Sequence, residues 1–304
     1  MKLAIVIVSW NTSDLLRRCL ETVFIYPPNA PFEVWVVDND SQDDSVAMVR
    51  EHFPQVHCLA NDHNPGFAGG NNQAIAASSG EYVLLLNPDT EVKPGALAAL
   101  VDFLDTHPAA GAAGSMLLNP DGSLQPSCYP MLTGPRELWR MLNLDGIWPV
   151  GEYHMHHWDT NQPRQVEVIQ GASLMIRRDL LDRVGLLDES YFMYTEEVDL
   201  CYRILQAGWL LYWVPQSQVI HYGGQSTRQV AAEMFLHLYG SKIQFFRKHY
   251  GRFTTTLYKC TLGLTSMLRL ALSPLVWLRP ADIRRTQLAL ARNYFQLLRV
   301  LPRL

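Results

Sequence analysis

Short runs of apolar residues alternate with polar, helix-starting segments along the first third of the chain. The apolar runs cover residues 3–8, 32–37, 56–59 and 82–86. A continuous apolar run bounded by turn residues is typical of a strand buried on both faces of a parallel sheet. Helices are predicted between these runs, for example from Ser45 to His52 after an acidic capping turn. The alternation with short connections predicts an α/β protein whose parallel strands are joined by right-handed crossovers.

The same pattern continues less regularly after residue 94. A helix is predicted from Pro94 to about His107, and further strands are predicted at 112–117, 166–169, 173–176, 210–214 and 218–222. Residues 119–165 are rich in Pro, Gly, Trp and His without a clean period, so we predict a long excursion over the face that carries the site. From Glu196 the pattern is helical, with Val198, Tyr202 and Leu205 predicted to face inward.

One predicted strand ends in residues that could bind a metal ion. The apolar run 82–86 stops at Asn87-Pro88-Asp89, and Pro88 can neither donate to a ladder nor follow a helical residue easily. Asp89 is therefore expected at the carboxyl edge of the sheet, where open α/β sheets bind ligands. A carboxylate at this edge can hold a divalent cation by oxygen. The alternative is an ordinary polar turn, since such triplets also arise by chance.

Two further segments offer chemistry of lower specificity. The glycine-rich segment with Gly66, Gly69 and Gly70 is not G-x-G-x-x-G and follows the third strand, so a nicotinamide-type site is not indicated. As a loop, it can bring backbone N–H groups close to a phosphate, or simply connect two elements. Glu196 and Glu197 are expected in the first turn of a helix, where the helix dipole stabilises carboxylates, or they simply begin that helix.

Composition narrows the class of protein. The chain has 304 residues and 48% hydrophobic content, enough for one large domain and an appendage. Its five cysteines are scattered without a CxxC pair, so neither a disulfide framework nor a zinc site is indicated and a reducing compartment fits. Only six apolar residues follow Met1-Lys2, which predicts a first strand rather than a signal peptide.

Charge is distributed unevenly. Residues 1–241 contain 13 Lys or Arg and 28 Asp or Glu, a net charge of −15. Residues 242–304 contain 12 Lys or Arg and one acidic residue, a net charge of +11. Lys259 and Arg269 divide the apolar segment 254–278 into stretches too short to span a bilayer. Residues 283–303 show a basic face and an apolar face, the pattern of an interfacial helix. The alternative is a helix packed on the catalytic domain or on a dimer partner.

The chain resembles the nucleotide-sugar glycosyltransferases of family 2, and most of all their rhamnosyltransferase-like branch. The matching motifs are Val6–Asn11, Val37–Ser41, Asn64–Asn72, Leu86–Asp89, Gln170–Ala172, Phe192–Tyr194, Glu196–Cys201 and His221–Gly224. The resemblance implies a GT-A domain, with a Rossmann-like, mostly parallel sheet flanked by helices, over residues 1–228. Residues 229–304 would then form a basic, apolar helical region that associates with a membrane.

The resemblance also implies roles for single residues. Asp38 would hold the nucleoside base, with Asp40 nearby, and Asn64, Gly66 and Asn71 would border the nucleotide. Ser9, Asn11 and Asn87 belong to the same nucleotide-sugar site. The metal would be held by Asp89 and completed by His221. Glu197 matches the general base, where many relatives have Asp, and the neighbouring Glu196 is the second candidate.

These roles predict an inverting glycosyltransferase that needs Mg or Mn. The donor would be a dTDP- or UDP-linked sugar, with rhamnose favoured by the resemblance alone. The acceptor would be a lipid-linked polysaccharide or a cell-surface glycan, which places the enzyme at the cytoplasmic face of the cell membrane, peripheral to an anionic surface. We expect no nucleic-acid partner, and a homodimer stays open. One alternative is a nucleotidyltransferase, which would usually show an N-terminal glycine-rich loop where this chain has Ser9–Thr12. The other is a catalytically silent scaffold that binds a nucleotide or a membrane, which the presence of both Asp89 and Glu197 disfavours.

Overall fold

The structure is a computed structural model that describes residues 1–224, 230–274 and 280–304, without the side chains of residues 281–283. It divides into two compact units. The first contains Met1–Met131, Glu152–Phe192 and Glu196–Gln229, and the second contains Leu132–Gly151, Met193–Thr195 and Val230–Leu304. The predicted domain boundary at 228 and 229 lies outside the described residues, and it stays a prediction.

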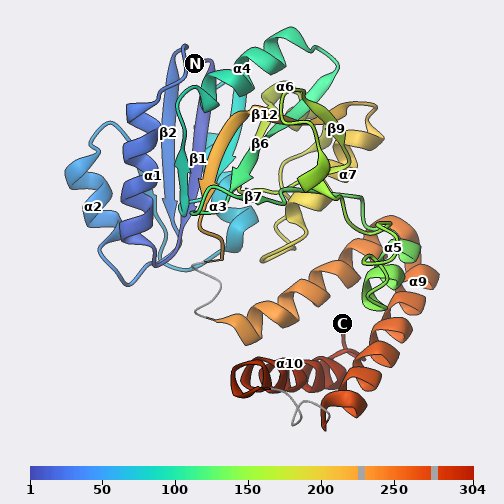
Figure 1. Cartoon of the computed structure of the whole chain (residues 1–304). Coiled ribbons are helices and arrows are strands. Elements are labelled where there is room, and N and C mark those ends of the chain that lie inside the picture. The colour runs from blue at the N-terminus through green and yellow to red at the C-terminus, as the bar shows by residue number, and fades with distance from the viewer. Residues whose placement is uncertain (225–229, 275–279) are drawn as a thin grey trace. The chain divides into compact units, whose positions relative to one another are not determined.

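A ten-stranded mixed sheet forms the centre of the first unit (Figure 1). Its main path runs β3-β2-β1-β4-β11-β6-β12-β5, where β11 and β5 are antiparallel to their neighbours. The strands on this path are β1 (Leu3–Ser9), β2 (Phe32–Asp38), β3 (His57–Ala60), β4 (Tyr82–Leu86), β5 (Thr90–Val92), β6 (Ala110–Leu118), β11 (Ser173–Arg177) and β12 (Leu210–His221). Off the path, β7 (Leu124–Gln125) pairs with β6 and β9 (Arg164–Val166) with β12, while β8 (Cys128–Tyr129) and β10 (Val168–Ile169) pair with each other. The predicted α/β class is confirmed.

Helices cover both faces of this sheet because its strands are apolar on both sides. On one face, α1 (Ser13–Ile25), α2 (Ser45–His52) and α4 (Ala96–Thr106) pack in one core cluster with Leu3 and Ile5 of β1. The alternate residues Ala4 and Val6 are equally buried. Their side of β1 faces α3 (Gly66–Ala77), and α6 (Arg178–Val184) and α7 (Glu196–Gln206) contact β11, β10 and β12. A short 3-10 helix, Met155–His157, lies before β9.

Four local predictions were wrong. The strand predicted at 166–169 is two short strands, since Val166 belongs to β9, which pairs with β12, and residues 168–169 form β10, which pairs with β8. The glycine-rich segment is not a loop but the beginning of α3, where small residues allow close helix–strand packing: a Cβ on Gly70 would lie 2.9 Å from Val8 Cγ1. The two strands predicted between 210 and 222 are one strand, β12, with a register shift between Val214 and Gln218. In α7 the buried residues are Leu200, Cys201 and Ile204 together with Glu196 and Asp199, not the predicted Val198, Tyr202 and Leu205.

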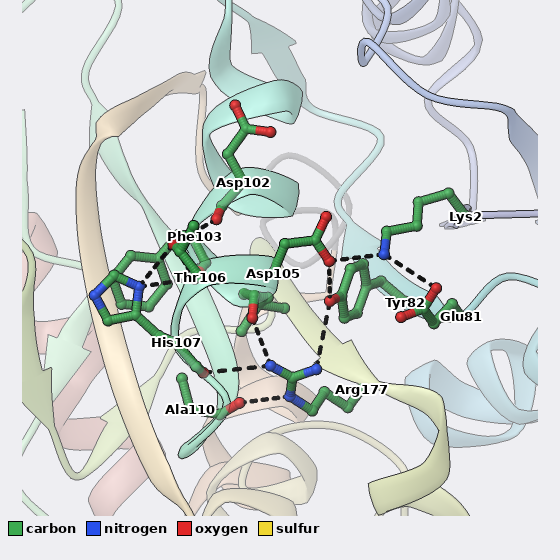
Figure 2. Close-up of polar contacts among 11 residues, drawn as sticks. Lys2, Glu81, Tyr82, Asp102, Phe103, Asp105, Thr106, His107, Ala110 and Arg177 are labelled. Atoms are coloured by element: carbon green, nitrogen blue, oxygen red, sulfur yellow. Dashed lines mark hydrogen bonds and ion pairs between the residues drawn. The ribbon is translucent and has the colours of Figure 1, made fainter.

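A polar network ties the amino end of β4 to its neighbours (Figure 2). The hydroxyl of Tyr82 donates to Asp105 Oδ1 over 2.6 Å, and Lys2 Nζ lies 2.7 Å from the same oxygen. Arg177, at the end of β11, donates to the carbonyl oxygens of Leu104 at 2.5 Å and Ala110 at 2.8 Å. Burial alone would raise the pKa of Asp105, but the hydrogen bonds from Lys2 and Tyr82 outweigh it and lower that pKa. The network lies at the edge opposite the carboxyl ends of the parallel strands. It joins β4 and β11 to residues 104–110 and takes no part in the candidate site at the other edge.

The second unit is helical. It contains α5 (Gly134–Met141), α9 (Ala231–Leu272), which bends at Gly251, and α10 (Ala281–Val300). Tyr294 and Leu297 of α10, and Leu301 directly after it, are buried in a core cluster with Tyr258 and other residues of α9. The apolar face of α10 that we predicted to meet lipid is therefore packed inside this unit, apart from Ile283, whose side chain lies outside the described residues. Among the helices described, none is both long and apolar enough to cross a membrane.

Candidate active site

The turn after β4 is held rigidly at the carboxyl edge of the sheet. Asn87 N donates to the carbonyl of Ala172 over 3.0 Å, and Thr90 Oγ1 donates to the carbonyl of Asn87 over 2.7 Å. The Tyr222 N–H donates to the Asp89 carbonyl over 2.9 Å. Two separate segments, at Ala172 and Tyr222, and one hydrogen bond within the turn thus hold the backbone of residues 87–90. They keep Asp89 beside the end of β12.

Asp89 and His221 meet at this edge, as predicted. His221 Nε2 lies 3.3 Å from Asp89 Oδ1 and 3.4 Å from Asn87 Nδ2, and Asp89 and His221 are 5% and 4% exposed. The parallel β6 and β12 end at the same edge as β4, and His221 pairs with Thr90 of β5. The sheet topology therefore joins residues that are 132 positions apart in the sequence.

Sequence reasoning missed Gln125, which orients His221. Gln125 Oε1 lies 2.6 Å from His221 Nδ1, while Gln125 Nε2 donates to Asn119 Oδ1 at 2.9 Å and to the His221 carbonyl at 3.1 Å. Since the amide nitrogen is committed to two acceptors, its oxygen accepts from Nδ1–H. The Nε2 lone pair of a neutral His221 then points toward Asp89 and Asn87. A ring held in this way by an outer hydrogen bond is the usual arrangement of a metal-binding histidine.

The donor set at this edge fits a divalent cation that shares its coordination with a ligand. A carboxylate oxygen from Asp89 and an imidazole nitrogen from His221 are available, and Asn87 would add its amide oxygen once its amide, whose nitrogen faces His221 Nε2, turned over. Within the described residues, no group of three or more His, Cys, Asp or Glu side chains forms a closed metal cage. Mg²⁺ and similar hard cations typically bind through one or two carboxylates and complete their shell with phosphate oxygens and water. The residues present fit a site of that open kind.

A second group of polar residues lies at the ends of β1 and β2. Ser9 pairs with Asp38 across the two strands, and the Ser9 and Thr12 hydroxyls are 3.0 Å apart. Asp38 is 2% exposed; its Oδ1 accepts from Ser41 N over 2.9 Å. Its Oδ2 is buried and has no hydrogen-bond partner among the described residues. A buried carboxylate oxygen left without a partner is costly, so this atom is a natural acceptor for a ligand N–H.

Asn11 and Asp40 shape the loops beside Asp38. Asn11 has a positive φ of 53°, its N–H donates to Ser41 Oγ over 2.8 Å, and its Oδ1 accepts from Gln42 N over 2.7 Å. Asp40 also has a positive φ, 62°, and is exposed. Both residues are near the predicted nucleoside position, but the contacts of Asn11 are structural.

Asn39 is a hub that sequence reasoning did not single out. Its Nδ2 donates to Asn64 Oδ1 at 3.2 Å and to the carbonyl of Gly66 at 3.0 Å, and its Oδ1 accepts from Asn61 Nδ2 at 3.1 Å. It therefore joins the end of β2 to the start of α3. Gly66 has φ 80°, and a Cβ there would lie 2.3 Å from the Phe192 carbonyl oxygen, so only glycine fits. Asn71, by contrast, uses its amide within α3, donating to the Phe67 carbonyl at 2.8 Å.

The two candidate bases at the start of α7 differ in environment. Glu196 is 4% exposed, and its Oε2 has no hydrogen-bond partner in the described chain. Burial, and then the charge of Glu197, raise the pKa of Glu196 well above its ordinary value. Glu197 is half-buried, and a Cβ on Gly171 would lie 3.8 Å from Glu197 Cβ. The segment 170–172, which also binds Asn87 N, thus connects Glu197 to the turn that holds Asp89.

Comparison with known proteins gives a consistent result. The profile of glycosyl transferase family 2 matches residues 4–149. An N-acetylglucosaminyl-diphospho-decaprenol L-rhamnosyltransferase of Mycobacterium tuberculosis is 31% identical over 265 residues, covering 82% of this chain and 85% of that protein. Rhamnosyltransferase WbbL of Escherichia coli (strain K12) is 24% identical over 243 residues, covering 76% of this chain and 87% of that protein.

Solved structures share the fold. A mannosyltransferase from Pyrobaculum calidifontis, in complex with GDP-Man and Mn2+, superposes with a TM-score of 0.56 at 16% identity, covering 98% of this chain and 86% of that one. This likeness supports the GT-A architecture, in which a mostly parallel sheet flanked by helices is followed here by C-terminal helices.

Proposed function

Because the chain belongs to glycosyl transferase family 2, in its rhamnosyltransferase-like branch, we propose that it transfers rhamnose from a dTDP-linked donor. The acceptor we propose is a hydroxyl of a sugar attached to a polyprenyl diphosphate, in the synthesis of a cell-envelope polysaccharide. The M. tuberculosis relative is named for such an acceptor, and two of the relatives are named for rhamnosyl transfer. A UDP-linked donor is the alternative within the same chemistry.

One observation carries the proposal: the residues for three separate tasks lie at one edge of one sheet. Asp38 offers a buried oxygen without a partner, Asp89 and His221 lie 3.3 Å apart, and Glu197 lies beside the segment that binds Asn87. A nucleoside-diphosphate sugar presents a base, a diphosphate and an anomeric carbon in that order. In the proposed arrangement, Asp38 Oδ2 accepts from the imide N–H of uracil or thymine. Ser9, Asn64 and Gly66 form the surroundings of the nucleotide.

The proposed reaction is an inverting displacement in which Glu197 is the general base. Glu197 takes the proton of the acceptor hydroxyl as its oxygen bonds to the anomeric carbon, and the bond from that carbon to the diphosphate oxygen breaks on the opposite face. The raised pKa of Glu196 favours its protonated form, which disfavours a second negative charge beside the base. Asp89, His221 and Asn87 would hold Mg or Mn. When bound, such a cation offsets the charge that develops on the leaving diphosphate.

The proposed acceptor implies a place for the enzyme. A polyprenyl diphosphate is anchored in a bilayer, so we place the enzyme at the cytoplasmic face of the cell membrane, as a peripheral protein. A homodimer is compatible with the same chemistry.

A donor panel tests the proposal. The full chain is incubated with dTDP-rhamnose, UDP-glucose, UDP-N-acetylglucosamine and GDP-mannose, each with Mg, Mn or a chelator, and with a water-soluble short-chain prenyl-diphosphate N-acetylglucosamine. We expect transfer from dTDP-rhamnose that stops when the metal is chelated. Transfer at an equal rate in the chelator would refute the metal assignment. Tight nucleotide binding without transfer or hydrolysis of any donor would favour the silent scaffold.

A further inference from the structure

The second half of α9 carries an apolar stripe that faces away from its own core. The stripe consists of Phe253, Leu257, Leu264, Met267, Leu268 and Leu272, whose exposed fractions range from 52% to 84%. The spacing of three, four and seven residues places them on one face of the helix. The opposite face carries Tyr258 and Leu262, which are buried in the core of the second unit. Proteins rarely expose a continuous apolar surface of this kind unless it binds something.

We propose that this stripe lies in the interfacial layer of an anionic bilayer, which holds the enzyme at the surface that contains its acceptor. The inference rests on the proposed function in one respect, because a lipid-linked acceptor requires the enzyme to reach a membrane. The stripe contains no charged residue, so nothing in it needs to keep contact with water. Residues 252–272 form a helix about 31 Å long at 1.5 Å per residue. Because only one face of this helix is exposed, it would lie along the surface rather than across it.

The net charge of the C-terminal part of this unit favours lipid over a second copy of the chain. Residues 242–304 contain 12 Lys or Arg and one acid, Asp282. Exposed basic residues of this unit include Arg247, Lys248, Arg252, Arg285, Arg292, Arg299 and Arg303. In a two-fold dimer the same surface meets itself, so an excess of one charge sign repels. An anionic headgroup layer attracts each basic residue near the surface.

This proposal assigns membrane binding to α9 rather than to α10, the helix for which the sequence predicted it. On α10, the apolar face packs against α9, which leaves Arg285, Arg292 and Arg299 exposed, with Phe295 beside them at 53%. Such a face would bind mainly through charge, and salt would release most of it. The stripe on α9 supplies the apolar part that salt does not remove.

Two matched variants of the full chain separate the two helices. Leu257→Gln combined with Leu264→Gln removes apolar area from the stripe without changing charge, and both positions are exposed, at 58% and 65%. Gln296→Glu, at an exposed position of α10, changes charge and leaves the stripe intact. Flotation is measured with vesicles of equal parts phosphatidylglycerol and phosphatidylcholine. We expect the double variant to partition at least about tenfold more weakly, and Gln296→Glu to lose less than about threefold.

A second readout needs no mutation. Cys260 is exposed beside the stripe, whereas Cys19, Cys128 and Cys201 are buried. We expect the same vesicles to protect the Cys260 thiol from a membrane-impermeant maleimide, as mapped by mass spectrometry. Transfer to the water-soluble acceptor should be unchanged in the double variant, which separates this proposal from the proposed function.

Two outcomes would overturn the inference. A greater loss of flotation for Gln296→Glu than for the double variant would assign the membrane surface to α10. A full chain that does not float, and that sediments as a dimer which the double variant dissociates, would make the stripe an interface between two copies.

Discussion

Gln125 provides a demanding test of how the metal site is oriented. Substituting Gln125→Met keeps the length of the side chain but removes the oxygen that lies 2.6 Å from His221 Nδ1. His221 is 4% exposed, so its Nδ1–H would lose its partner in a site where water cannot easily replace it. Leaving a buried donor unsatisfied costs about 1–3 kcal/mol. The ring avoids this cost by moving its proton to Nε2, where the proton blocks the metal.

The expected effect on metal affinity follows from that cost. Either the unsatisfied donor or the wrong tautomer weakens binding of Mn²⁺ by about 10–100-fold, the range found for lost outer hydrogen bonds to metal ligands. Titration calorimetry with Mn²⁺ in saturating dTDP measures the affinity. Nitrogen NMR of labelled histidine reports the tautomer of His221, which a merely structural role of Gln125 would not change.

Asn119→Ala is the matched control, because Asn119 accepts from Gln125 Nε2 at 2.9 Å but does not contact the His221 ring in any described hydrogen bond. We expect this variant to keep Mn²⁺ affinity within about threefold. Unchanged affinity and an unchanged tautomer in Gln125→Met would refute the orienting role.

Three further predictions concern the site and the fold. Asp89→Ala should abolish metal-dependent donor binding in calorimetry, while His221→Ala, which removes a neutral ligand, should weaken it less; unchanged binding in Asp89→Ala would exclude the assignment. Gly66→Ala should lower both Tm and nucleotide affinity, because the new Cβ would lie 2.3 Å from the Phe192 carbonyl oxygen at a φ of 80°. Gly122→Ala is the control: φ there is 84° but no atom lies within 4 Å of the new Cβ, so only Tm should change. Asp105→Asn should lower Tm at pH 7, and the Tm difference from the unchanged chain should shrink as the pH falls below 3.8. The reason is that the pKa of Asp105 is lower in the folded state than its ordinary value of 3.8. Its carboxylate therefore stabilises the fold fully above that pH, and the stabilisation is lost as the folded protein takes up the proton. A Tm difference that stays constant down to pH 2.5 would show that the carboxylate charge is not what stabilises this network.

The sequence was sufficient to predict the parallel strands at the centre of the sheet and the polar residues after them, but not the antiparallel pairing of β11 or the edge strand β5. Strands buried on both faces have continuous apolar runs, so β1, β2 and β4 and the polar residues after them could be located directly. Asp38 and Asp89 follow from this because parallel strands end at one edge. Gln125 could not be predicted, since it lies in an aperiodic segment and contacts a residue 96 positions away.

The errors in the helices have a common physical cause. A helical pattern shows which residues share a face but not what that face meets. In α7 the inward face includes Asp199, which is 0% exposed and pairs with Arg203 Nε at 2.8 Å. Because this buried position is polar, the spacing of apolar residues alone indicated the wrong face. In the second unit, both α9 and α10 have apolar faces, and only the packing shows that α10 uses its face in the core.

The most direct test of the account is the turnover of Glu197→Gln beside Glu196→Gln, measured with dTDP-rhamnose and the water-soluble acceptor. If Glu197 is the general base, Glu197→Gln should lower kcat by roughly 10²–10⁴ while calorimetry shows donor binding retained. Glu196→Gln should cost much less, because burial raises the pKa of that carboxyl and so makes it a poorer carrier of the charge that a base needs. Turnover close to that of the unchanged chain in Glu197→Gln, or a larger loss in Glu196→Gln, would contradict the account.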